Sequence, residues 1–174
     1  MIADWADDEL RLTDTVSVLL GAERGVYPSA NSLFVRGAAE HVVIDASVTV
    51  VQRGGAPDRV DAVLNSHCHE DHMAGNGMFA QAKVHIHERD LIGVASLEGL
   101  MSGYDASPET HPEFARQLLE EFHFSPRPDA QTFGDGAVFD LGGGTRVEAV
   151  HLPGHTAGHS GFRCGRSSTA PMSI

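Results

Sequence analysis

Six of the eleven histidines lie in two short segments, and this clustering is the feature of the sequence that points to chemistry. Segment 65–72 reads Asn-Ser-His-Cys-His-Glu-Asp-His and contains His67, His69, Asp71 and His72. His67 and His69 are two residues apart, so in an extended chain both imidazoles point the same way. Histidine is the commonest metal ligand because neutral imidazole offers a lone pair near neutral pH. These four side chains can therefore close around one metal ion or a close pair.

The second segment, 151–159, reads His-Leu-Pro-Gly-His-Thr-Ala-Gly-His and also follows an expected strand. Its proline and glycine favour a turn that swings His155 toward the first cluster. Three imidazoles with one open position form the usual site of a zinc hydrolase, whose zinc lowers the pKa of bound water to about 7. A carboxylate beside such a water, here Asp71, orients it and takes its proton.

Together, the two motifs resemble those of the metallo-β-lactamase superfamily. The matching patterns are His-x-His-x-Asp-His at 67–72 and Pro-Gly-His-Thr-x-Gly-His at 153–159, preceded by a strand that ends at Asp45. The resemblance covers roughly residues 15 to 164 and implies an α/β (α+β) fold, the αββα sandwich. We expect residues 1–164 to form this domain and the serine-rich residues 165–174 to form a polar tail. The resemblance also implies that Asp45 hydrogen-bonds within the metal-site loop.

Carried over to this chain, the resemblance implies metal ligands on both histidine segments. His67, His69 and His155 would bind the first metal, and Asp71 and His72 would contribute to the second. Members of the superfamily supply a bridging aspartate and a further histidine from a second half, whereas this chain has no acidic residue after Glu148. We therefore expect an incomplete sandwich that lacks its C-terminal half. An uncovered sheet face would then favour self-association.

The leading functional hypothesis is a metal-dependent hydrolase that holds one or two zinc ions and acts on a small molecule. A metal-bound hydroxide, steered by Asp71, would attack an ester, thioester or amide carbonyl. One alternative is a mononuclear iron sulfur dioxygenase of the same superfamily, which shares the His-Cys-His-x-Asp-His pattern. Another is a catalytically inactive metal-binding fragment.

We interpret the other histidines and Cys68 as structural residues and not as metal ligands. His85 and His87 are also two residues apart but have no acidic or turn partner. We therefore predict that they lie on the surface of a strand. Cys68 should project away from the metal and pack. His159 would orient its loop, and His151 would end a strand.

Apolar segments separated by turn residues must position these side chains. Strands are expected at 15–20, 32–36, 40–45, 60–64, 83–87, 137–141, 146–151 and 161–164. Helices are expected at 88–101 and after Thr110, which with Glu113 forms a capping box. Strands, then helices, then strands again favour a layered fold.

The composition limits the kinds of binding partner and the cellular compartment that we expect. The net charge of −12 excludes a basic nucleic-acid footprint and disfavours an anionic membrane surface. Apolar runs are too short to span a bilayer, and the early acidic residues do not fit a signal peptide. Two cysteines are too few for a disulfide framework, so we expect a cytoplasmic protein.

Overall fold

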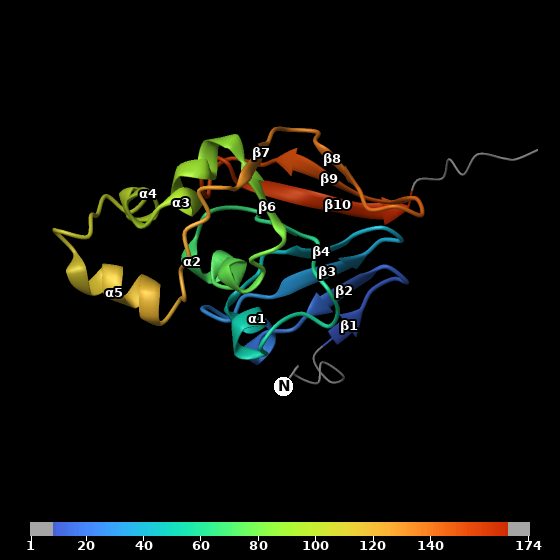
Figure 1. Ribbon diagram of the computed structural model, residues 1–174, viewed down its shortest axis with the longest axis horizontal. Helices are drawn as coiled ribbons and strands as arrows, with labels where there is room; N and C mark the ends of the chain where they lie inside the picture. Colours follow the sequence, from blue (N-terminus) through green and yellow to red (C-terminus); the bar gives the residue numbers. More distant parts are fainter. Residues whose placement is uncertain (1–8, 167–174) are drawn as a thin grey trace, which may run out of the picture.

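The computed structural model describes residues 9–166, which form two β-sheets and a group of short helices (Figure 1). The predicted polar tail, 165–174, lies almost entirely outside the described residues. The two described residues of that segment, Gly165 and Arg166, belong to the last strand. The mixed α/β fold class is confirmed.

The first sheet has seven strands whose spatial order follows the chain. β1 to β4 pair in antiparallel fashion, whereas β4 to β7 pair in parallel, so the carboxyl ends of β4, β5 and β6 meet at one edge. The strands are β1 (Glu9–Arg11), β2 (Val16–Leu19), β3 (Ser32–Arg36), β4 (His41–Ile44), β5 (Ala62–Leu64), β6 (Lys83–His87) and β7 (Gln131–Phe133).

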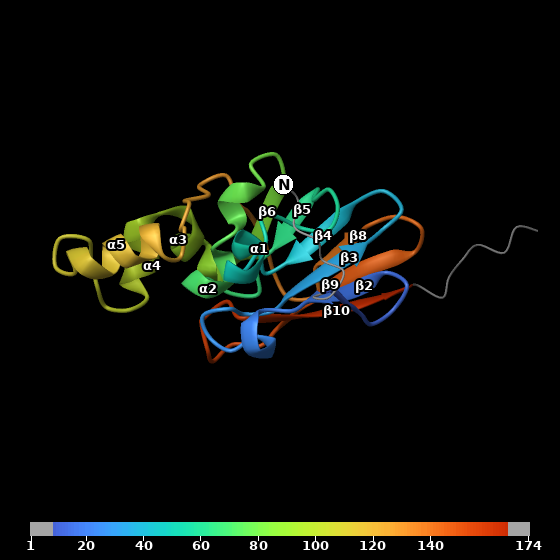
Figure 2. The same cartoon turned by 90° about the horizontal axis from the view of Figure 1, so that it is seen from below.

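Short helices pack against one face of this sheet and extend beyond one of its ends, as two perpendicular views show (Figures 1 and 2). They are α1 (Val48–Gln52), α2 (Glu70–Met73), α3 (Leu91–Ala95), α4 (Leu97–Ser102) and α5 (Pro112–Glu120), with single turns η1 (Ala22–Arg24), η2 (Asn76–Met78) and η3 (Glu88–Asp90). Alternate residues of the strands, among them Phe34, Val43 and Ile86, pack with these helices into the larger core.

The second sheet packs on the opposite face of the first. It consists of β8 (Val138–Asp140), β9 (Thr145–His151) and β10 (Ser160–Arg166), all antiparallel in the order β10-β9-β8. Val35 and Leu64 of the first sheet meet Leu141 and Val147 in a second core. The uncovered sheet face expected from the sequence is therefore not on the first sheet, because these three strands bury its apolar side chains.

The outer face of the second sheet is the face that remains open among the described elements. No described helix contributes to the core between the sheets, so the described layers run helices, sheet, sheet. The outer face is largely polar: Arg146 lies 3.8 Å from Asp140, and Arg163 lies 3.6 Å from Glu148. The αββα sandwich is thus present without its outer helical layer in residues 9–166.

Several local predictions needed correction. The expected helix 88–101 is η3, α3 and α4, with a break at Ser96, whose hydroxyl accepts a hydrogen bond from Gly99 N at 3.0 Å. The capping box at Thr110 does not form, because helix α5 begins at Pro112 and the Thr110 hydroxyl lies 3.0 Å from that of Ser107. Within residues 9–166, no helix combines the length and apolarity needed to cross a membrane.

Candidate metal centre

Two loops build the site, one from each sheet. The first loop leaves β5 and enters α2, whose N-terminal boundary residue is His69. Asn65 N donates to His85 O at 2.8 Å, which ties the start of this loop to β6. The second loop joins β9 to β10 and carries His155. The sheets pack face to face, so the loops meet at one end of the sandwich.

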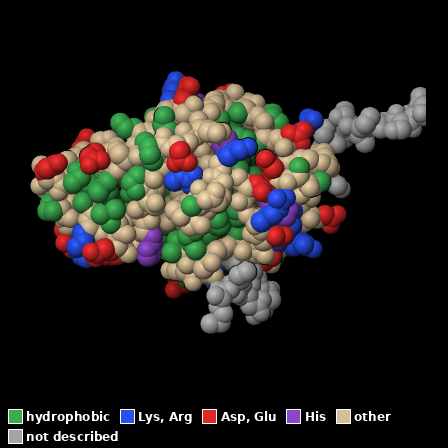
Figure 3. Space-filling view, in the orientation of Figure 1, with side chains coloured by type: hydrophobic (Ala, Val, Ile, Leu, Met, Phe, Trp, Pro, Cys, Tyr) green, Lys and Arg blue, Asp and Glu red, His purple; other side chains and the backbone are tan. Residues whose placement is uncertain are grey.

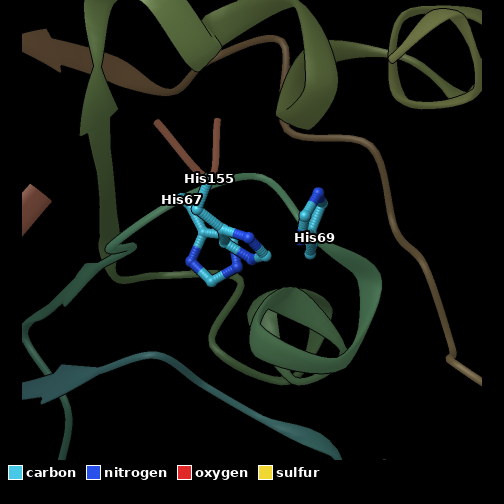
Figure 4. Close-up of side chains that lie close together, drawn as sticks. All are labelled: His67, His69 and His155. Atoms are coloured by element: carbon cyan, nitrogen blue, oxygen red, sulfur yellow. The ribbon is translucent and has the colours of Figure 1, made fainter. Parts of the chain in front are cut away.

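Three imidazoles converge where the two loops meet. His67, His69 and His155 each offer a ring nitrogen, and these nitrogens all lie within 4.8 Å of one another (Figure 4). The ring centroids of His67 and His69 are 4.8 Å apart, and those of His69 and His155 are 4.4 Å apart. The turn that brings His155 into place contains Gly154 at φ 143°, a conformation that suits glycine. The structure thus assembles the three histidines that the sequence singles out.

Asp45 holds the first loop in shape, as the resemblance implied. It lies just after β4 with φ 55°, and its carboxylate accepts Ser66 N at 2.6 Å and Ser66 Oγ at 2.7 Å. Its Oδ2 also lies 3.0 Å from His72 Nδ1. Burial acts to raise the Asp45 pKa, but the hydrogen bonds and charge of His72 and the Ser66 donors hold it below its usual value.

The buried ring of His67 has one nitrogen engaged and one free. Nδ1 lies 2.8 Å from Ser66 Oγ, whereas Nε2 is buried without a hydrogen-bond partner in the described part of the chain. Burial, followed by the charge of His72, lowers the pKa of His67 to about 3, so the ring stays neutral. Burial likewise lowers the pKa of His69. Neutral imidazoles with a free lone pair fit a divalent cation, and burying such a nitrogen without a partner would otherwise be unfavourable.

Asp71 and His72 lie beside the three-histidine group rather than within it. The His72 ring centroid is 4.3 Å from that of His67, and His72 Nε2 is 3.6 Å from Asp71 Oδ2. Burial, with Glu70 next to it, raises the pKa of Asp71 above its usual value despite the opposing charge of His72. All five predicted ligands therefore gather in one region, with Asp71 and His72 on α2 forming a neighbouring pair.

The second loop is anchored by a residue that sequence reasoning missed. Asp90, buried at the end of η3, accepts Thr156 Oγ1 at 2.5 Å and Gly158 N at 2.7 Å. A Cβ on Gly158 would lie 2.7 Å from Asp90 Cγ, so glycine permits this close approach. Ser160 N also donates to Ser66 O at 2.8 Å, which joins the two loops directly. The signal for Asp90 was its position just past strand 83–87.

For the remaining histidines and Cys68, the structure confirms some predictions and corrects one. His87 was expected on a strand surface but is 3% exposed, with its ring stacked at 4.2 Å on that of His151. His151 ends β9 as predicted, and Cys68 packs against the larger core as predicted. His159 Nδ1 lies 3.0 Å from Leu152 O, a contact within its own loop.

Comparison with known proteins agrees with this architecture. The model of the metallo-β-lactamase superfamily matches residues 27–170. Similar solved structures include the native FEZ-1 metallo-β-lactamase from Legionella gormanii, with 19% identity, a TM-score of 0.63, and coverage of 93% of this chain and 58% of that one. A β-lactamase from Chitinophaga pinensis has 19% identity and a TM-score of 0.65, covering 96% and 59%. A metallo-β-lactamase family protein from Thermus thermophilus has 20% identity and a TM-score of 0.60, covering 87% and 56%.

The chain belongs to the metallo-β-lactamase superfamily, because the family model matches most of its length. The three solved structures are 19% or 20% identical to it, so they establish the shared fold. The chain spans about 58% of the length of the first of these structures. No curated protein sequence matches it.

Proposed function

We propose that the site binds zinc and hydrolyses an ester, thioester or amide bond of a small molecule. The observation that carries this proposal is the group of three histidines around the buried, unpartnered Nε2 of His67. An all-nitrogen set of three protein ligands is typical of catalytic zinc, which needs one position for a reactant. His67, His69 and His155 would hold the first ion, and Asp71 and His72 would contribute to a second.

The residues around the site would have separate roles in hydrolysis. When bound, zinc supplies Lewis acidity that activates a water and polarises a carbonyl. The Asp71 carboxylate would orient the attacking water and accept its proton, a role that its raised pKa favours. Asp45 acts through Ser66 and His72, holding the loop so that the ligands need no rearrangement. We further propose a cytoplasmic location, in keeping with the two free cysteines.

The test combines metal analysis with turnover. The purified chain is stripped of metal, reloaded with zinc or iron, and assayed for hydrolysis of a generic thioester and a generic lactone. We expect zinc-dependent hydrolysis that His67→Ala abolishes. The matched control is His111→Ala, because His111 lies at the start of α5 and outside the three-histidine group.

Two outcomes would contradict the proposal, and each corresponds to an alternative. Iron retention with consumption of oxygen and a sulfur substrate would identify a dioxygenase. Zinc binding with no hydrolysis of either substrate would identify a metal-binding fragment without catalytic activity. Metal content and oxygen uptake are measured on the same samples, so the outcomes are separable.

A further inference from the structure

We infer that a pocket beside the metal centre binds a small molecule that combines an apolar acyl or aryl part with a negatively charged group. The pocket lies between α3, α4 and the second loop, has a volume of about 240 Å³, and is bordered by His69 and His155. The claim that its occupant is the substrate rests on the proposed function, whereas the claim of binding does not. The pocket is also lined by Ile92, Leu100, Tyr104 and Arg89, and these four side chains would determine what it binds.

The wall of the pocket is mainly apolar. Leu100 is a buried lining residue, and Ile92 is 64% exposed although it is a large aliphatic residue. Hydrophobic side chains also gather on the surface over α4 and α5 (Figure 3). Ligand pockets combine such apolar walls with a few polar groups that fix orientation. At about 30 Å³ per water-sized group, the pocket holds at least about eight groups, which suits an aryl ring or a medium acyl chain.

One side of the pocket is held in place before any ligand arrives. The carboxylate of Glu70, which is 8% exposed, accepts Tyr27 Oη at 3.2 Å and also accepts the hydroxyl of Tyr104. The Tyr104 ring packs edge-on against Phe114 of α5, with centroids 5.3 Å apart, and lies 5.6 Å from the His69 ring. The ring of Tyr104 is therefore fixed relative to a proposed metal ligand, which reduces the ordering that binding requires.

Arg89 provides the positive charge. Among the lining residues, Asp90 is engaged by Thr156 and Gly158, and Ser102 Oγ donates to Gly99 O at 2.7 Å. The Arg89 guanidinium forms no ion pair with any residue in the described range 9–166. In a chain of net charge −12, an unpaired arginine at a pocket favours a carboxylate or another anion.

Binding to the metal-free protein tests the inference without any turnover. The probes are 3-phenylpropionate, its neutral amide and the short acid propionate, titrated by NMR or calorimetry into the chelator-treated chain. We expect 3-phenylpropionate to bind at least about tenfold more tightly than propionate or the amide. Ile92→Gln should remove the preference for the phenyl group, and Arg89→Gln should remove the preference for the acid over the amide.

The control is Leu119→Gln, which makes the same change at another exposed aliphatic residue, 47% exposed and outside the pocket. It should bind all three probes as the unchanged protein does. Equal affinity for the three probes, or equal losses in Ile92→Gln and Leu119→Gln, would overturn the inference. Probe binding without hydrolysis would support the pocket while contradicting the proposed function. Hydrolysis without any discrimination between the probes would support the proposed function while contradicting the pocket.

Discussion

The Asp90 carboxylate receives a hydrogen bond from Thr156 Oγ1 at 2.5 Å, which joins the end of η3 to the loop that carries His155. A second bond, from Gly158 N at 2.7 Å, fixes the same loop two residues further on. Of the three clustered histidines, His155 alone comes from the second sheet. Its position therefore depends on Asp90 as well as on its own backbone.

Removal of Asp90 should weaken metal binding although Asp90 is not a ligand. Asp90→Ala should lower zinc affinity by about 10- to 100-fold, because residues that orient ligands commonly have effects of this size. Competition with a chromophoric chelator measures the affinity. Asp140→Ala is the control, since Asp140 is exposed on the second sheet and 3.8 Å from its partner Arg146. Equal affinities in the two variants would contradict the prediction.

The pair Asp71 and His72 should decide the number of metal ions. We expect His72→Ala to keep one tightly bound zinc, because His67, His69 and His155 are untouched, and to lose any second ion. Asp71→Ala should do the same and also reduce hydrolysis. Mass spectrometry under native conditions counts the ions directly. A loss of all zinc in His72→Ala would contradict this prediction, because the first metal position would then also depend on His72.

Asp45 should contribute to stability as well as to ligand placement. Asp45→Asn keeps the size of the side chain and tolerates φ 55°, but it removes the charge that receives the Ser66 and His72 bonds. We expect a loss of about 1–3 kcal/mol in the free energy of unfolding, measured by urea denaturation. Asp61→Asn is a suitable comparison, because the Asp61 side chain is more exposed. A smaller loss at Asp45 than at Asp61 would refute this role.

The metal-free protein should lose stability in mild acid because His67 is buried and neutral. Its pKa is about 3 in the fold against an ordinary 6.5, so between these values the unfolded chain binds a proton that the folded chain does not. The free energy of unfolding should therefore fall as pH falls, by at most about 1.4 kcal/mol per pH unit from this residue.

Urea denaturation of chelator-treated protein between about pH 4.5 and pH 7 measures this dependence. His67→Gln should have a shallower slope, because the variant lacks the buried ring. The pKa of His72 is raised, so its own contribution has the opposite sign and is lost as pH rises. An unchanged slope in His67→Gln would assign the acid sensitivity to other groups.

Self-association is proposed through the second sheet. Its outer face is not covered by any described helix, and β8, an edge strand, pairs only with β9 among the described strands. Val138 is 56% exposed on this sheet, so Val138→Lys should weaken association. Sedimentation velocity over a wide concentration range is the measurement. A single monomer at all concentrations would exclude the proposal.

The sequence predicted the chemistry of the site better than the elements around it. The strands 32–36 and 83–87 match β3 and β6 because their apolar residues are contiguous and bounded by turns. Helix α2 was not predicted, because its four residues are too few to show periodicity. The burial of His87 depends on stacking with His151, which is 64 residues later, and no local pattern contains that contact. The hydrogen bonds of Asp90 are equally long-range.

The proposed ligands of the first metal position come from two loops that are far apart in the chain. His69 and His155 are separated by 155 − 69 = 86 positions, yet their rings are 4.4 Å apart. A bound ion would therefore act as a cross-link that closes a long loop and restricts the unfolded chain. Because the ion would bind the folded chain in preference to the unfolded one, thermal stability would depend on the free metal concentration. The ion would then lock the two sheets together as well as serve the reaction.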